Sequence, residues 1–171
     1  MKAALVVSAL ALSACSTTIG AVNPRPNVVV AAQAPSVGID VGKVADVQQP
    51  KGESSNGVIY LSHVTIRDFR QTLRNGFRNA VGEHFAQDAA PLRLVLDTAD
   101  LEFSNLGNLG RFLTIRYRAH WLDRDGRTVA EVAGTAQPRN PTETGPRHLE
   151  DVVEVLYEKL IDGFDKTTKH D

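Results

Sequence analysis

Strict alternation of apolar and polar residues over 113–121 is the feature that most limits how this chain can fold. The apolar residues occupy odd positions, whereas Arg116 and Arg118 lie among the polar residues at even positions. Successive side chains of a strand point to opposite faces, so the pattern predicts a strand with one buried and one exposed face. A Gly-containing turn at 123–126 and a second alternating stretch follow, which together predict a β-hairpin over 111–136.

Two amphipathic helices are predicted in addition to the hairpin. The first begins near Thr65, where Thr65 and Asp68 have the spacing of a capping box, and it fades around Phe85. The second has the strongest pattern in the chain, because apolar residues recur every three or four positions over 149–164. Each helix has one apolar face and therefore needs a sheet or another helix to cover it.

Further strands are predicted at 37–42 and at 92–103, and residues 58–61 are expected to form a small strand or a packing segment. In the strand predicted at 92–103, the apolar residues change from even to odd positions between Thr98 and Asp100. This change predicts a β-bulge or a strand that passes between two environments. The order of elements predicts an α+β fold with an antiparallel-rich sheet of about four strands and two amphipathic helices packed on one face.

The N-terminal segment has the features of a secretory signal peptide. Lys2 precedes an apolar run, and small residues lead to Leu12-Ser13-Ala14-Cys15. The apolar run ends at Leu12 and is too short to span a hydrocarbon core of about 30 Å. The tetrapeptide resembles the bacterial lipobox. The resemblance implies that residues 1–14 are removed and that Cys15 carries a diacylglyceryl thioether and an acylated amine.

The remainder is expected to form one domain behind a tether. Residues 15–34 include Pro24 and Pro26 and show no sustained period, which predicts a lipidated tether. Residues 35–171 are expected to form a single periplasmic α+β domain. The only cysteine is Cys15, so no intramolecular disulfide is expected and stability must come from burial.

The order of the segments resembles that of small Gram-negative envelope lipoproteins of the enterobacterial YajG type. Only the lipobox is a specific motif, and Val47 stands where that group usually has an arginine. Two other classes have a similar arrangement of helices on a sheet: lipoproteins that plug an outer-membrane barrel during lipopolysaccharide assembly, and auxiliary lipoproteins of envelope transport systems. From Ser16 onwards, however, this sequence departs from the N-terminal pattern expected of the barrel-plugging lipoproteins. The segments that carry the YajG-type resemblance are 41–46, 73–82, 92–101, 113–132 and 149–164.

The sequence contains no motif for catalysis. The nucleophile-elbow and phosphate-loop patterns do not occur, and the five histidines form no H-x-x-x-H pair. We therefore expect a protein that is not an enzyme and has neither cofactor nor metal. The net charge of −1 gives no reason to expect nucleic acid as a partner.

Arginines form the candidate contact surface. Arg67, Arg70, Arg74 and Arg78 form a ridge along the first predicted helix, and the last three are spaced four residues apart. They are interpreted either as a solvated helix face or as a surface for lipid phosphates, lipopolysaccharide or an acidic partner. Arg116 and Arg118, on the exposed sheet face, could share a surface with them.

These observations predict the cellular location of the protein more specifically than its activity. Ser16 follows the lipobox cysteine, and by the enterobacterial sorting rule it favours a periplasm-facing anchor in the outer membrane. The expected function is a non-enzymatic interaction or accessory subunit of the cell envelope, held to the membrane by lipid on Cys15 and bound to an envelope protein. The alternative is a binder or transport accessory for an envelope lipid or lipopolysaccharide, which requires an apolar groove between helices and sheet.

Overall fold

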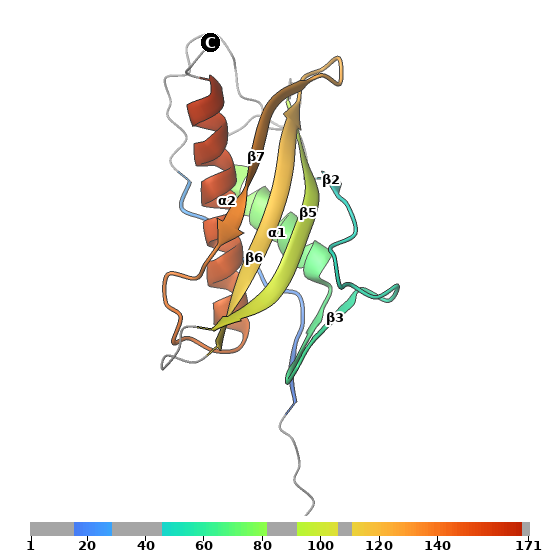
Figure 1. Cartoon of the computed structure of the whole chain (residues 1–171), viewed down its shortest axis with the longest axis vertical. Coiled ribbons are helices and arrows are strands. Elements are labelled where there is room, and N and C mark those ends of the chain that lie inside the picture. Colours follow the sequence, from blue (N-terminus) through green and yellow to red (C-terminus); the bar gives the residue numbers. More distant parts are fainter. Residues whose placement is uncertain (1–15, 29–45, 82–91, 106–110, 169–171) are drawn as a thin grey trace, which may run out of the picture.

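The computed structural model describes residues 16–28, 46–81, 92–105 and 111–168, and it has an α+β fold (Figure 1). Cys15 and the strand predicted at 37–42 lie outside the described residues. The described elements, in chain order, are β1 (Thr17–Ile19), β2 (Asp46–Val47), β3 (Val58–Leu61), β4 (Val64–Arg67), α1 (Phe69–Val81), β5 (Arg93–Asn105), β6 (Arg111–Leu122), β7 (Thr128–Ala136) and α2 (Pro146–Thr168).

The larger sheet has four strands in the order β2-β5-β6-β7. The pairs β5–β6 and β6–β7 are antiparallel, whereas the two-residue β2 runs parallel to β5. The β6–β7 hairpin confirms the hairpin predicted from alternation, and Gly126 in its turn has a φ of 78°. The pairing of β5 shifts between Leu96 and Thr98. This irregularity confirms that the strand contains a bulge, although the bulge lies just before the predicted position between Thr98 and Asp100.

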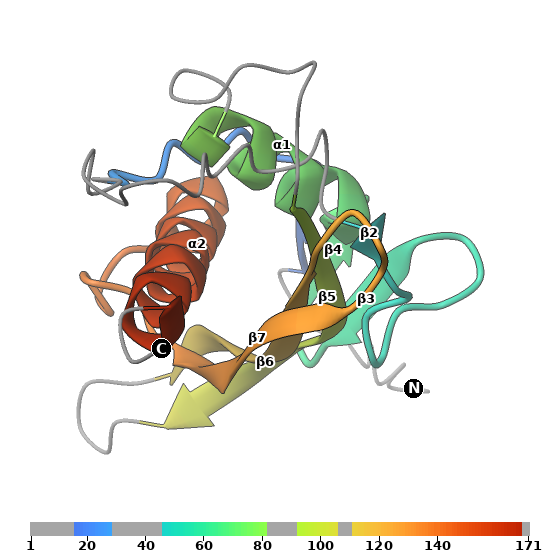
Figure 2. The same ribbon diagram turned by 90° about the horizontal axis from the view of Figure 1, so that it is seen from above.

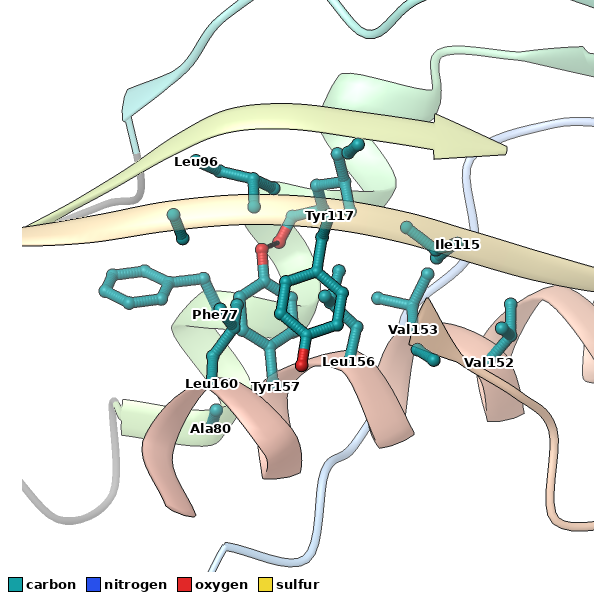
Figure 3. Close-up of a cluster of buried hydrophobic side chains, with 14 of the residues drawn as sticks. Phe77, Ala80, Leu96, Ile115, Tyr117, Val152, Val153, Leu156, Tyr157 and Leu160 are labelled. Atoms are coloured by element: carbon teal, nitrogen blue, oxygen red, sulfur yellow. Dashed lines mark hydrogen bonds between the residues drawn. The ribbon is translucent and has the colours of Figure 1, made fainter. Parts of the chain in front are cut away.

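Both helices cover one face of this sheet, as predicted (Figure 2). Fully buried side chains fill the space between the two layers (Figure 3). The rings of Phe77 on α1 and Tyr157 on α2 have centroids 5.9 Å apart, and those of Trp121 on β6 and Phe164 on α2 are 4.9 Å apart. Contacts between side chains of the sheet and of both helices therefore hold the domain together.

The predicted start of the first helix was wrong. Thr65 lies in β4, paired with Tyr60 of β3, and the helix begins only at Phe69. Asp68 separates strand from helix with a φ of 57°, and its carbonyl accepts a hydrogen bond from the Thr72 amide. Strand β4 has only four residues, so its alternation of apolar and polar side chains could not be recognised in the sequence beside the longer helical period of α1.

The smaller sheet has the order β1-β4-β3, with β1 parallel to β4 and β3 antiparallel to it. Ile19, Ile66 and Ile59 form one row across the three strands, and all are buried. Thr18, Thr65 and Tyr60 form the next row, which points to the opposite face. A core-facing row of isoleucines therefore connects this sheet to the main core.

The predicted tether over 15–34 was wrong for residues 17–28, which belong to the folded domain. Strand β1 pairs with β4, and the side chains of Val22 and Val28 are buried in the core. We call residues 20–28 the N-terminal strap, because they cross both helices. The strap has no hydrophobic period since neighbouring side chains, rather than a strand partner, bind its backbone.

Within the described residues, neither helix is long and apolar enough to cross a membrane.

Candidate functional site

The four arginines predicted on the first helix have different surroundings. The placement of Arg67 was wrong, because this residue ends strand β4 and precedes α1. The Nε of Arg70 lies 2.8 Å from an Oε of Glu53, whose side chain is only 1% exposed. Arg74 and Arg78 are exposed, and no ion pair involves them in the part of the chain that the structure describes. Arg70 therefore neutralises a buried carboxylate, whereas Arg74 and Arg78 present their charges to solvent.

The arginines of β6 lie on the outer face of the four-stranded sheet, as predicted. Arg116 is 2.8 Å from Glu102 on the neighbouring strand, and Arg118 is exposed between Thr98 of β5 and Ala133 of β7. His120, on the same face, has its Nδ1 2.8 Å from the carboxylate of Asp97 at the bulge. The face is therefore a surface of mixed charge and not a basic patch.

The structure does not bring the two groups of arginines together. Helix α1 covers the inner face of the four-stranded sheet, whereas Arg116 and Arg118 point outward from the opposite face (Figure 2). A single flat ligand cannot contact both groups without also covering the sheet edge. The two groups must be considered as separate surfaces.

A network of acidic residues on α2 was not predicted from the sequence. The guanidinium of Arg139 binds three carboxylates spaced three and four residues apart, those of Asp151, Glu154 and Glu158. Its partial burial alone would lower the pKa of Arg139, but the bonds to Glu158 and Asp151 outweigh this effect, and the pKa is raised above its usual value. The spacing of the three acids along one face of α2 was the available signal.

The same acidic residues hold the N-terminal strap. The amide of Arg25 donates to Glu154 at 2.9 Å, and the amide of Asn27 donates to Glu158 at 3.0 Å. On α1, the side-chain amide of Asn75 donates to the Val22 carbonyl at 2.9 Å. Three further contacts come from Thr72, whose hydroxyl accepts from the Val22 amide, and from Asn79, which bonds Asn23 and Pro24. The strap is thus fastened to both helices.

A pocket of about 250 Å³ lies between the two sheets and the start of α2. Its one fully enclosed polar side chain is His148, which is 4% exposed. The His148 Nε2 accepts a hydrogen bond from the Leu113 amide at 2.8 Å, which leaves Nδ1 as the N–H donor. That Nδ1 has no partner among the described residues. The walls are formed by Thr17, Ile19, Val64, Phe103, Leu113, Glu143, Thr144, Gly145 and His148.

The acidic residues near the hairpin turn have structural contacts. Asp123 accepts hydrogen bonds from the amides of Asp125 and Arg127, at 2.9 and 2.8 Å, which is ordinary turn chemistry. Among the described residues, no group of three or more His, Cys, Asp or Glu side chains could hold a metal ion.

No family model matches the chain, and no curated protein matches it. One solved structure with a similar arrangement is that of a Xanthomonas campestris protein described as belonging to the DUF330 family. It is 14% identical, and the match covers 91% of this chain and 98% of that chain with a TM-score of 0.47. This similarity assigns neither a family nor an activity to the chain.

Proposed function

We propose that this protein is a lipid-anchored periplasmic domain of the outer membrane that acts as a non-enzymatic interaction or accessory subunit. The observation that carries the proposal is the junction between the lipobox-like tetrapeptide and the fold. The tetrapeptide ends at Cys15, and the first strand begins at Thr17. The export segment thus stops just before the folded chain starts, so removal of residues 1–14 would leave every described strand and helix in the mature domain.

The packing of the domain supports an interaction role over a carrier role. The space between helices and sheet, where a lipid carrier would need a cavity, is filled by buried side chains such as Leu96, Leu156 and Tyr157 (Figure 3). Exposed charges remain at Arg74 and Arg78 on α1 and at Arg118 on the sheet. Charges of this kind favour specific contacts with a protein or a headgroup without burying a ligand.

Lipidation is tested by changing the cysteine and its neighbour separately. Cys15→Ser should abolish incorporation of a labelled fatty acid and leave the domain soluble in the periplasm or leave the precursor uncut. Ser16→Asp is the matched control, since it should retain the label but move the protein to the inner membrane. Labelled, membrane-bound Cys15→Ser protein would contradict the anchor, and outer-membrane retention of Ser16→Asp would contradict the sorting.

The interaction role is tested on the two exposed arginines of α1. Crosslinking of the wild-type chain in intact cells should give a defined envelope adduct. The double variant Arg74→Gln, Arg78→Gln and the single variant Arg118→Gln report on the two separate surfaces. Loss of the adduct in only one of them would identify the contact surface, whereas enzymatic turnover by the purified protein would contradict a non-enzymatic role.

A second function, binding of an envelope lipid or lipopolysaccharide, is favoured by the pocket around His148. Its walls are mostly apolar, and the Nδ1–H of His148 could donate to an ester carbonyl after a small movement of the ring. Native mass spectrometry of the protein released from membranes should then show a bound lipid in addition to the covalent one. Val64→Phe, which enlarges an apolar side chain of the pocket wall, should remove that lipid if the pocket holds it.

A further inference from the structure

We infer that the outer face of the three-stranded sheet, bearing Tyr60 and Arg67, lies against the membrane surface. This inference rests on the proposed lipid anchor at Cys15. It adds to that proposal the orientation of the domain and names the surface that contacts the bilayer. The occupant of this face is a bilayer that contains anionic phospholipid.

The first step is the length of chain between anchor and fold. Thr17 lies two residues after Cys15, so the two Cα atoms are at most about 7 Å apart. Thr17 is held in β1, where it pairs with Val64 and its amide donates to the His63 carbonyl at 2.9 Å. A lipid on Cys15 therefore leaves no room for a flexible spacer.

The second step is the position of β1 within the molecule. Strand β1 pairs along β4, and its first residue lies beside the β3–β4 turn. In Figure 1 this end of the domain is the end at which the chain enters, and the β6–β7 turn is at the opposite end of the long axis. An anchor at Cys15 thus brings the β3–β4 hairpin close to the bilayer and holds the β6–β7 turn away from it.

The third step is the chemistry of the exposed row on this sheet. Tyr60 is 68% exposed, the most exposed of the large apolar side chains in the described part of the chain. It shares a row with Thr18 and Thr65, and Arg67 lies on the same face two residues along β4. The described strands of this sheet contain no acidic residue.

This composition suits the headgroup region of a bilayer. Tyrosine is enriched at the membrane–water interface, where its ring can lie among the upper acyl chains while its hydroxyl stays hydrated. An arginine close to an anionic surface is attracted to phosphates, and the absence of acidic neighbours on the three strands avoids repulsion.

The test uses tryptophan as a reporter of depth in two matched variants. Tyr60→Trp places the reporter on the proposed surface, and Val129→Trp places it on β7 beside the distant turn. Val129 is the other large apolar side chain with substantial exposure, at 39%. The native Trp121 is 1% exposed and contributes the same background to both variants.

The full mature chain is inserted in vesicles of phosphatidylethanolamine and phosphatidylglycerol with brominated acyl chains. If cells supply lipid on Cys15, that lipid is the anchor, and if they do not, the Cys15 thiol is coupled to a maleimide phospholipid. The proposed orientation is therefore tested even if natural lipidation fails. Emission from Tyr60→Trp should shift to shorter wavelength and lose intensity, whereas emission from Val129→Trp should not change.

Two results would overturn the inference. Equal quenching of both variants would mean that the domain has no fixed orientation on the bilayer. If the emission of the Tyr60→Trp variant is the same on vesicles as in solution, this face does not contact the bilayer and is instead available to a protein partner. Circular dichroism of each variant confirms that the reporter has not altered the fold before either result is read.

Discussion

Replacement of Gly76 by alanine separates the preference of an isolated helix from the packing of this one. Alanine is favoured over glycine inside a helix by about 1 kcal/mol, so sequence alone predicts a more stable protein. Gly76, however, faces Tyr157 and Val153 of α2. A Cβ built there lies 2.8 Å from Cε2 of Tyr157 and 3.0 Å from Cγ1 of Val153.

The neighbours cannot easily retreat from that methyl group. Ordinary contact begins at about 3.4 Å, so the ring of Tyr157 would have to move by roughly 0.6 Å. The ring is fully buried, and its hydroxyl donates to the Leu73 carbonyl at 2.7 Å. Overpacking of this kind costs about 1–3 kcal/mol. After subtracting the helix preference, we expect Gly76→Ala to destabilise the domain by up to about 2 kcal/mol.

Urea unfolding followed by the fluorescence of Trp121 measures this change. A matched background tests its cause, because Tyr157→Leu removes the ring that a methyl group would meet. In that background Gly76→Ala should regain the helix preference and become neutral or stabilising. If Gly76→Ala raises the unfolding midpoint of the wild-type protein, the close contact between Gly76 and Tyr157 is refuted. It is also refuted if Gly76→Ala destabilises the wild type and the Tyr157→Leu variant equally.

Three further predictions follow from buried or strap contacts. Burial raises the pKa of Tyr157 far above its usual value. Above about pH 10 the unfolded chain therefore loses the Tyr157 proton before the folded protein does, and the free energy of unfolding falls as pH rises. Compared with the wild type, Tyr157→Phe should have a free energy of unfolding lower by about 1 kcal/mol at neutral pH, but this free energy should fall less steeply in alkali. Arg70→Gln should lower the free energy of unfolding by about 1–3 kcal/mol, because it leaves Glu53 without its cation. Arg74→Gln should change it by no more than about 0.5 kcal/mol in the same assay. Equal effects of the two variants would contradict the pairing of Arg70 with Glu53. Glu158→Ala should speed hydrogen exchange at the Asn27 amide while leaving the Thr17 amide protected, and unchanged exchange at Asn27 would show that the strap is held elsewhere.

Sequence reasoning succeeded where a pattern repeats over many residues. The helix at 149–164 and the hairpin at 111–136 have long regular periods, and the bulge near Thr98 was visible because a single displaced residue moves every later side chain to the other face. The same reasoning misplaced the start of α1, since Asp68 adopts a left-handed backbone conformation that no local pattern announces.

The candidate site was harder to predict because its contacts are between residues far apart in the chain. Arg70, Arg74 and Arg78 look equivalent along the helix, yet only Arg70 meets a buried carboxylate, from a loop seventeen residues earlier. The strap appeared to be a tether because its backbone is bound by polar side chains of α1 and α2. The signal that could have found it is the pair Asn75 and Asn79, four residues apart beside the apolar stripe of α1.

The contacts of the strap also determine when, during synthesis of the chain, this segment reaches its partners. The Asn27 amide and its acceptor Glu158 are 131 residues apart, which at ordinary rates of synthesis is a delay on the order of 10 s. The strap is therefore among the first described residues to be made and among the last to find its partners. Until α2 has formed, the strap has, among the described polar side chains, only its contacts with Thr72, Asn75 and Asn79 of α1. Once α2 has docked, Glu154 and Glu158 bind the second half of the strap, so this N-terminal segment is fully fastened only when the C-terminal helix is in place.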